Sequence, residues 1–294
     1  MTLSGERVET AAPTWFREAV TEQPSTSVAN VDGVPIHYRR WGSGDGRPVV
    51  LVHGGAAHAS WWDHIAPLLA RHRSVVALDL SGHGDSGRRE RYDLELWAAE
   101  TLAVAEHAGL TRRPVVIGHS LGGFVALRAA MLNGGRLGGV AAIDSPIRDI
   151  TSQERAARKQ RTFRPLRVYL TREEILGRFR PVPADGAPLS YVCDHIAERS
   201  IVAVDGGWSW KFDPRIFGRV PLDPASLRAT ECRIALVRAE HGMLSLPMTS
   251  TIVEQLGPRV PVIELAASGH HVMLDQPLAL ASVLNTLLEA WDQA

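Results

Sequence analysis

The chain of 294 residues is 45% hydrophobic and 22% charged, and its 32 Lys and Arg residues balance its 32 Asp and Glu residues. This balance argues against a strong overall field for nucleic acid or an anionic membrane, so we expect neither as a partner. Two cysteines, Cys193 and Cys232, make no disulfide framework. The first 25 residues are polar, and no stretch approaches the ~18 apolar residues of a membrane span. We therefore expect a cytoplasmic protein.

Short apolar runs alternate with helix-length segments along most of the chain. Near-continuous apolar runs are typical of parallel strands that are buried on both faces. In residues 27–41 the pattern of apolar and polar residues differs from these runs, and it predicts an antiparallel edge pair. The predicted class is α/β, a mostly parallel central sheet with helices on both faces. Its expected strands are 48–52, 74–78, 114–117, 140–143, 233–237 and 260–263, and its expected helices lie near 60–71, 93–108, 121–133, 248–256 and 277–291.

The alternation stops in a segment that is rich in Arg, Pro and aromatic residues. A long insertion after one strand of a parallel sheet predicts an inserted helical cap over the carboxyl ends of the strands, where open α/β sheets bind ligands. Helical pieces are expected near 152–161, 171–179 and 188–203. The predicted organisation is an N-terminal extension (1–26), a core (27–146 and 227–294) and a cap (147–226).

Ser120 lies in the run Gly118-His119-Ser120-Leu121-Gly122-Gly123, after a predicted strand and before a predicted helix. A serine hydroxyl is a poor nucleophile unless it is exposed and a base can take its proton. A sharp strand-to-helix turn exposes such a serine in strained backbone geometry, and the flanking glycines remove side chains that would clash with the turn. This context predicts that Ser120 is a nucleophile; the alternative is a chance match in a tight turn.

Two further loops supply candidate partners for Ser120. His53-Gly54-Gly55-Ala56 follows the strand at 48–52, and its glycines leave backbone NH groups uncovered. The NH groups of Gly55 and Leu121 can form an oxyanion hole, which stabilises charge that develops in the transition state; the alternative is a turn without a catalytic part. His270 and His271 follow the last strand. We expect His270 to be the general base, with His271 as the second choice.

These motifs, together with Asp79-Leu80-Ser81-Gly82-His83-Gly84-Asp85-Ser86, resemble those of α/β-hydrolase fold proteins over residues 28–150 and 230–293. The resemblance implies a serine hydrolase with a helical cap that needs no cofactor. It also implies that the segment from Asp79 to Ser86 is a structural loop, so that His83 takes no part in catalysis. Haloalkane dehalogenases and epoxide hydrolases of this fold use an aspartate as nucleophile, so the serine argues against both.

The triad acid departs from the commonest pattern of this fold. Many relatives carry an aspartate after the strand that precedes the last one, but the matching loop, residues 237–242, contains Glu240 and no Asp. Asp144 follows the predicted strand at 140–143, where a buried carboxylate needs a partner. The order Ser120, Asp144, His270 is also the chain order of this fold. We expect Asp144 to be the acid, with Glu240 as the alternative.

Other residues are candidates for binding rather than chemistry. Aromatic side chains could wall an apolar acyl pocket, although packing of the cap on the core is an equally good explanation. The candidate substrate-binding residues are Trp61, His119, Trp208 and Trp210. His53, His58 and His64 fit no metal-ligand spacing, so we expect no metal. A basic run is interpreted as a solvated helix face, with a docking patch for a phosphate-bearing acyl carrier as the alternative; it comprises Arg155, Arg158, Lys159, Arg161, Arg164 and Arg167.

The sequence thus predicts a capped α/β hydrolase that cleaves a carboxylic ester, thioester or lactone. The partner would be a small-molecule acyl substrate, bound covalently to Ser120 during turnover. One alternative is hydrolysis of a carbon–carbon bond in a vinylogous diketone by the same triad. Others are a slow-turnover ligand receptor and a cofactor-free oxygenase or perhydrolase. The oligomeric state is not predicted.

Overall fold

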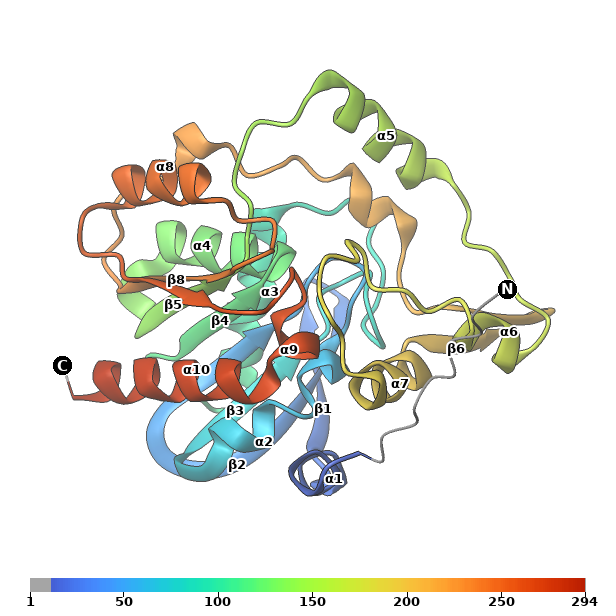
Figure 1. The fold of residues 1–294 in the computed structure, drawn as a ribbon, viewed down its shortest axis with the longest axis horizontal. Coiled ribbons are helices and arrows are strands. Elements are labelled where there is room, and N and C mark those ends of the chain that lie inside the picture. Colours follow the sequence, from blue (N-terminus) through green and yellow to red (C-terminus); the bar gives the residue numbers. More distant parts are fainter. Residues whose placement is uncertain (1–11, 294) are drawn as a thin grey trace, which may run out of the picture.

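A seven-stranded sheet runs through the computed structural model, which describes residues 12–293 (Figure 1). The strand order is β1-β2-β4-β5-β8-β9, and β3 pairs with β2 outside this path. β1 is antiparallel to β2, and the other pairs are parallel. The strands are β1 (Ser25–Val31), β2 (Val34–Val52), β3 (Arg73–Leu78), β4 (Val115–His119), β5 (Gly139–Ile143), β8 (Ile234–Ala239) and β9 (Val262–Leu265).

Helices cover both faces of this sheet because successive residues of the central strands point to opposite sides. In β2, Val50 and Val52 pack into one hydrophobic cluster, whereas Val49 and Leu51 pack into another. The predicted fold class is confirmed. One face carries α3 (Leu94–His107), α4 (Leu121–Asn133) and α8 (Leu246–Leu256); the other carries α1 (Thr14–Thr21), α2 (Ala66–Leu69), α9 (Val272–Asp275) and α10 (Pro277–Asp292) (Figure 1).

The segment between β5 and β8 arches away from the sheet (Figure 1). It contains α5 (Ser152–Phe163), α6 (Arg172–Leu176), α7 (Ser190–Arg199) and a hairpin of β6 (Ile201–Val204) and β7 (Gly207–Trp210). The helix expected at 188–203 is therefore wrong in its last part. Asp205 and Gly206 form the hairpin turn, and Gly206 has a φ of +81°. An Asp-Gly pair with β-branched residues before it and aromatic residues after it favours a hairpin over a continued helix.

Two other elements differ from the prediction. The expected edge pair and the strand at 48–52 are joined, because β2 runs without a break from Val34 to Val52 and absorbs several register shifts against β3. The helix expected at 60–71 is broken into a 3₁₀ turn (Ala59–Trp62), α2 and a second 3₁₀ turn (Ala70–His72). Pro67 lies in this stretch and has no NH to continue a longer helix.

The predicted N-terminal extension is partly packed onto the core. Residues 1–11 of that extension lie outside the described residues. Phe16 of α1 is buried, and its ring centre lies 4.8 Å from that of Tyr191 in α7 and 6.0 Å from that of His64. Within residues 12–293, no helix is both long and apolar enough to cross a membrane.

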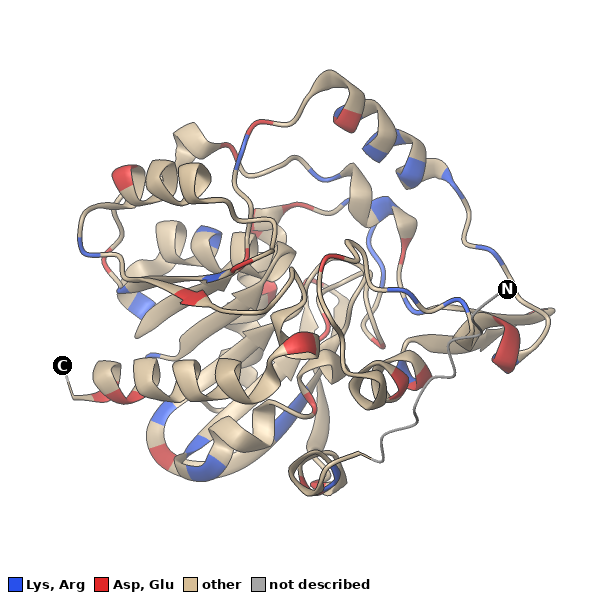
Figure 2. Ribbon diagram, viewed as in Figure 1, with Lys and Arg blue, Asp and Glu red and all other residues tan. Residues whose placement is uncertain are grey.

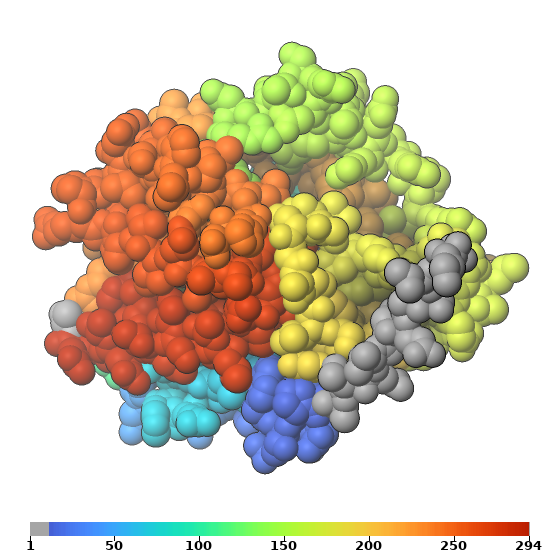
Figure 3. All heavy atoms as spheres, in the orientation of Figure 1, coloured from blue at the N-terminus to red at the C-terminus, as the bar shows by residue number. Residues whose placement is uncertain are grey.

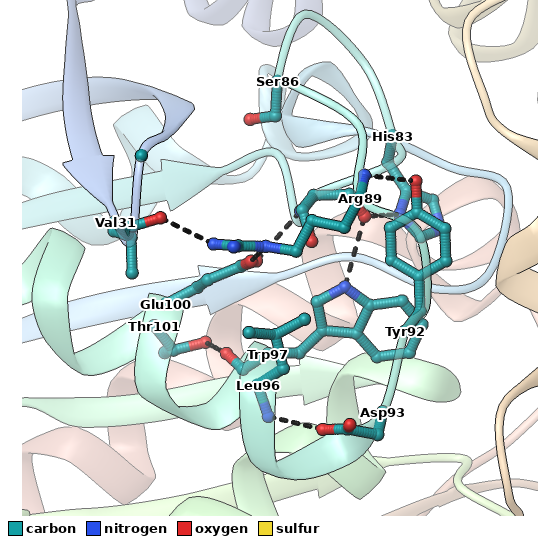
Figure 4. Close-up of polar contacts among 12 residues, drawn as sticks. Val31, His83, Ser86, Arg89, Tyr92, Asp93, Leu96, Trp97, Glu100 and Thr101 are labelled. Atoms are coloured by element: carbon teal, nitrogen blue, oxygen red, sulfur yellow. Dashed lines mark hydrogen bonds and ion pairs between the residues drawn. The ribbon is translucent and has the colours of Figure 1, made fainter.

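The loop after β3 is held by a buried polar cluster (Figure 4). Glu100 of α3 accepts hydrogen bonds from the Ser81 NH at 2.9 Å and from the Arg89 guanidinium at 2.8 Å. The Trp97 indole NH donates to the Ser81 carbonyl at 3.2 Å. Burial raises the pKa of Glu100 in spite of these donors. His83 packs 5.7 Å from the Trp97 ring, inside this cluster and away from Ser120.

Candidate active site

Ser120 occupies the sharp turn between β4 and α4. Its φ of 52° and ψ of −113° lie in a region that non-glycine residues rarely adopt. The Ser120 NH donates to the Ile143 carbonyl at 2.9 Å, and the Ser145 hydroxyl donates to the Ser120 carbonyl at 3.0 Å. These two bonds tie the strained turn to the end of β5, so the neighbouring strand holds the serine in place.

The glycines around Ser120 are required by close packing. A β-carbon at Gly118 would overlap the Gly122 carbonyl, and one at Gly122 would overlap the Val52 carbonyl. A β-carbon at Gly123 would overlap the Ser145 hydroxyl. The backbone of the turn therefore touches its neighbours directly, which is possible only without side chains at these positions.

Three side chains from the ends of three different strands meet at the carboxyl edge of the sheet. His270 Nε2 lies 3.0 Å from Ser120 Oγ, and His270 Nδ1 lies 2.7 Å from Asp144 Oδ2. With the Nδ1 proton donated to Asp144, Nε2 is free to accept the Ser120 hydroxyl proton. The structure thus brings together the three residues that the sequence singled out as nucleophile, acid and base.

Asp144 is fully buried and surrounded by donors. Its carboxylate accepts the NH groups of Met243 at 2.7 Å and Leu244 at 3.1 Å as well as the His270 ring. Burial by itself raises the pKa of a carboxyl group, but the His270 hydrogen bond and charge and these two NH groups together lower the pKa of Asp144. Asp144 is therefore an anion held toward His270.

Glu240, the alternative acid, lies elsewhere. Its carboxylate is exposed and accepts the Ala267 NH at 2.7 Å. The loop that carries it contributes to the site differently, because a β-carbon at Gly242 would lie 2.5 Å from Asp144 Oδ2. The loop after β8, where many relatives carry their acid, here wraps around the carboxylate of Asp144.

Two carboxylates that the sequence did not single out accept hydrogen bonds from the loop that carries His270 and hold it in place. The His270 NH donates to Asp185 at 2.9 Å, and the Gly269 NH donates to Asp275 at 2.8 Å. A β-carbon at Gly269 would lie 2.5 Å from the Gly186 NH nitrogen. Asp185 belongs to the segment between β5 and β8, so that segment positions the base directly. Neither aspartate lies in a recognisable motif, which explains why the sequence did not reveal it.

The proposed oxyanion donors lie side by side next to Ser120. A β-carbon at Gly55 would meet the Leu121 side chain at 3.8 Å, and both residues line the cavity above Ser120. Leu121 is the first residue of α4, so its NH has no acceptor within the helix. His53 holds the glycine loop, because its Nε2 accepts the Leu80 NH at 3.1 Å and its Nδ1 donates to the Gly54 carbonyl at 2.7 Å.

The cavity above Ser120 has a volume of about 500 Å³, within the range of small-molecule pockets. Trp61 and His119 line it, as expected. Trp208 and Trp210, the other two candidates, do not line it: both lie on β7, where Trp208 pairs with Tyr169 and Trp210 packs against Phe179. Figure 3 shows the surface hollowed where the light-green, orange and yellow segments meet.

Two further histidines pack around His270. His119 Nε2 donates to the His270 carbonyl at 2.8 Å. Burial and the nearby charges of His270 and His271 lower the pKa of His119 well below its usual range. Burial likewise lowers the pKa of His271 to about 4, and its ring lies 5.4 Å from that of Trp61. Both rings are therefore neutral near pH 7 and leave His270 as the proton acceptor.

The histidines that were considered for a metal site have separate partners. His58 Nε2 lies 2.8 Å from the Ser200 hydroxyl, and His64 Nε2 donates to the Met273 carbonyl at 2.8 Å. His53 forms hydrogen bonds with the Gly54 carbonyl and the Leu80 NH. Ring nitrogens of a different group, His119, His270 and His271, lie within 4.8 Å of one another. Of these, His270 and His119 are already engaged within the triad and its support.

The cavity also contains residues that no sequence pattern indicated. Phe124 lies one helical turn after Ser120, and Ile216, Phe217 and Arg219 approach from the segment between β5 and β8. Only the position of Phe124, four residues after the nucleophile on a predicted helix, could have identified it. The other three are brought to the site by tertiary packing.

Comparison with known proteins agrees with this architecture. A family profile described as Alpha/beta hydrolase family matches residues 49–283. The chain is 27% identical to esterase Rv0045c of Mycobacterium tuberculosis, with 92% of both proteins covered. It is 36% identical over 42% of its length to the dihydrolipoyllysine-residue acetyltransferase component of the acetoin cleaving system of Pseudomonas putida, of which it spans 33%. The structure of E-2-(acetamidomethylene)succinate hydrolase matches with a TM-score of 0.79 at 18% identity, covering 91% of this chain and all of the other.

The parallel sheet, the strained serine turn and the histidine loop are those of an α/β hydrolase. The chain belongs to the Alpha/beta hydrolase family and is a hydrolase.

Proposed function

We propose that this protein is a serine hydrolase that cleaves a carboxylic ester, thioester or lactone through an acyl-enzyme on Ser120. The observation that carries the proposal is the continuous chain of hydrogen bonds from Ser120 Oγ through the His270 ring to Asp144, with distances of 3.0 and 2.7 Å. Such a chain activates a serine hydroxyl for attack on a carbonyl carbon.

In the first half of the reaction, Ser120 Oγ forms a bond to the substrate carbonyl carbon while its proton passes to His270 Nε2. The carbonyl oxygen becomes an oxyanion beside the NH groups of Gly55 and Leu121. The tetrahedral intermediate then expels the alcohol or thiol, which takes the proton from His270. Asp144 remains ionised and stabilises the imidazolium, in keeping with its lowered pKa.

In the second half, water replaces the leaving group. His270 takes a proton from the water molecule, whose oxygen attacks the acyl carbon of the ester on Ser120. The intermediate releases the carboxylic acid, and Ser120 Oγ regains its proton from His270. The enzyme returns to its starting state without any other reactant.

The surroundings of the triad support this assignment. We propose that residues 147–226 act as a cap, because the cavity above Ser120 is lined both by the core and by this segment. The esterase from Mycobacterium tuberculosis aligns over almost the whole chain. One fold can host several reactions, and measured turnover of alternative substrates identifies the bond that is cleaved.

The proposal is tested by kinetics with p-nitrophenyl esters, acyl thioesters, lactones and a vinylogous diketone. The wild type should turn over at least one acyl compound, and Ser120→Ala should lower its kcat by about 10⁶, the loss seen in a comparable triad. Ser282→Ala, an exposed serine on α10, is the matched control and should behave as wild type. Turnover of the diketone alone would assign carbon–carbon hydrolysis instead, and a single burst without further turnover would favour a receptor.

A further inference from the structure

One side of the cavity above Ser120 is basic. Arg148 and Glu154 form a two-pronged ion pair, with distances of 3.0 and 2.5 Å, so the charge of this glutamate is already matched. The other charged groups that line this wall are the guanidinium groups of Arg158, Arg161 and Arg219. Within residues 12–293, no carboxylate lies within 4.0 Å of these three groups. Figure 2 shows the basic residues along α5 and the segment beneath it.

Arg219 packs against α4, the helix that follows the reacting serine. Its guanidinium carbon lies 5.2 Å from the ring centre of Phe124. Phe124 follows Ser120 by four residues on α4, a rise of about 6 Å, and its NH donates to the Ser120 carbonyl at 3.3 Å. The guanidinium therefore faces the same space as the nucleophile. Its own hydrogen bond, to the Val220 carbonyl at 3.4 Å, is long.

Arg158 holds Arg219 in this position. From α5, its guanidinium donates to the Phe217 carbonyl at 3.4 Å and to the Arg219 carbonyl at 3.2 Å. These bonds fix the backbone that carries Arg219 beneath α5. Burial and the positive charge of Arg158 lower the pKa of Arg219 to about 9. A half-buried cation without a counter-ion is unfavourable, so an anion that enters the cavity would be stabilised there.

We propose that Arg219 binds an anionic group of the substrate, so that the acyl compound cleaved at Ser120 carries a carboxylate or phosphate in addition to its reacting carbonyl. This inference rests on the proposed function, because Ser120 supplies the reacting end. A guanidinium presents paired NH donors that match either anion.

The cavity continues outward, so it can take an anion that is a carboxylate on the acyl chain or a phosphate on the leaving group. An adjoining cavity of about 360 Å³ shares Arg158, Phe217 and Arg219 with the first and is also lined by Arg155 and Lys159. A carboxylate on a short acyl chain would meet Arg219 inside the first cavity. A phosphate on a longer leaving group would extend past Arg219 toward Arg155 and Lys159. The basic run of α5 is therefore only partly a solvated face.

Two matched substrate pairs test the proposal. p-Nitrophenyl hemiglutarate and p-nitrophenyl pentanoate have the same chain length and differ by the terminal carboxylate. Butyryl-4′-phosphopantetheine and butyryl-pantetheine share the thioester and the whole pantetheine chain and differ by the terminal phosphate. In at least one pair, kcat/KM of the wild type should favour the anionic member. Arg219→Gln should lower the ratio of anionic to neutral kcat/KM by about ten-fold or more, the size expected for one charged hydrogen bond.

The controls separate charge recognition from folding. Arg219→Lys keeps the charge and should retain most of the ratio, whereas Arg164→Gln, an exposed arginine of the same segment outside this cavity, should leave it unchanged. Thermal unfolding checks that each variant is folded. The pair that responds to Arg219→Gln identifies the anion as carboxylate or phosphate. Equal ratios in wild type and Arg219→Gln for both pairs would overturn the proposal.

Calorimetric binding of glutarate and of coenzyme A to Ser120→Ala separates this proposal from the proposed function. Binding that is weakened about ten-fold or more by Arg219→Gln supports the anion site even if no ester is cleaved. If esters are cleaved but neither anion binds in an Arg219-dependent way, the serine hydrolase assignment stands and the anion site is refuted.

Discussion

Asp144 and His270 lie 126 residues apart in the chain, and Asp144 Oδ2 approaches His270 Nδ1 to 2.7 Å. The carboxylate follows β5, and the loop after β8 supplies NH groups that hold it toward the ring. The acid thus comes from one strand while the neighbouring strand's loop provides its support. This arrangement explains how the loop after β8 can lack an aspartate and still serve the site.

Asp144→Asn should lower kcat far more than Glu240→Gln. The amide no longer stabilises the imidazolium and can hold the wrong tautomer of His270; the corresponding change in another Ser-His-Asp triad lowers kcat by about 10⁴. Glu240 is exposed and bonds to Ala267, so its change to Gln should alter kcat less than two-fold, on the order of ordinary surface substitutions. Steady-state ester hydrolysis measures both. The reverse ranking would place the acid on the later loop.

Asp185→Ala should lower kcat/KM about ten-fold, because the His270 backbone loses its acceptor and the ring loses its alignment. Asp185→Asn keeps an oxygen at the same place and should retain most of the activity. The exposed Asp194→Ala on α7 is the control for loss of a negative charge. If Asp185→Asn is as impaired as Asp185→Ala, the contribution is one of charge and the positioning explanation fails.

Gly123→Ala should destabilise the fold by about 1–3 kcal/mol, as expected for an added methyl group in a packed interior. The new β-carbon would overlap the Ser145 hydroxyl, which itself holds Ser120. Gly55→Ala is the comparison, because its β-carbon would meet Leu121 at an ordinary 3.8 Å. Urea unfolding followed by fluorescence gives both free energies. Equal stability of the two variants would contradict the packing argument.

The stability of the fold should fall as the pH falls from about 6.5 to about 4. His64 is fully buried, and burial lowers its pKa to about 4, whereas an unfolded chain protonates histidine near pH 6.5. Between these values the unfolded state binds more protons, so the free energy of unfolding decreases with decreasing pH, by about 1.4 kcal/mol per pH unit for each such histidine.

Replacing His64 removes one group that takes up a proton when the chain unfolds in this pH range. His64→Gln should therefore reduce the slope of unfolding free energy against pH in this window by up to one proton. The exposed His72→Gln is the control and should leave the slope unchanged. Urea unfolding at intervals between pH 4 and pH 7 gives the slopes, and identical slopes for wild type and His64→Gln would contradict the burial argument.

The sequence predicted those parts of the structure that depend on local rules. Ser120 was found because its turn needs glycines at fixed spacing, and Asp144 because a carboxylate at the end of a buried strand needs a partner. The hairpin at residues 201–210 was missed because α7 ends at Arg199, only two residues before β6 begins, although Asp205-Gly206 is a turn signal.

The rest of the site depends on tertiary packing that no short pattern encodes. Trp208 and Trp210 lie outside the cavity above Ser120, and the sequence could not show this because an aromatic side chain indicates burial but not the surface it packs against. Arg219 and Asp185 were not singled out, since each reaches the site from an irregular stretch of the segment between β5 and β8. Residues in such segments are positioned by long-range contacts.

The most direct test of the central claim is the mass of the protein during turnover of a slowly hydrolysed acyl ester. Intact-protein mass spectrometry after rapid acid quenching should show an added acyl group, and peptide mapping should place that group on Ser120. Ser120→Ala should show no added mass. Steady turnover of the ester with no acyl group on Ser120, or with full activity in Ser120→Ala, would contradict the acyl-enzyme mechanism.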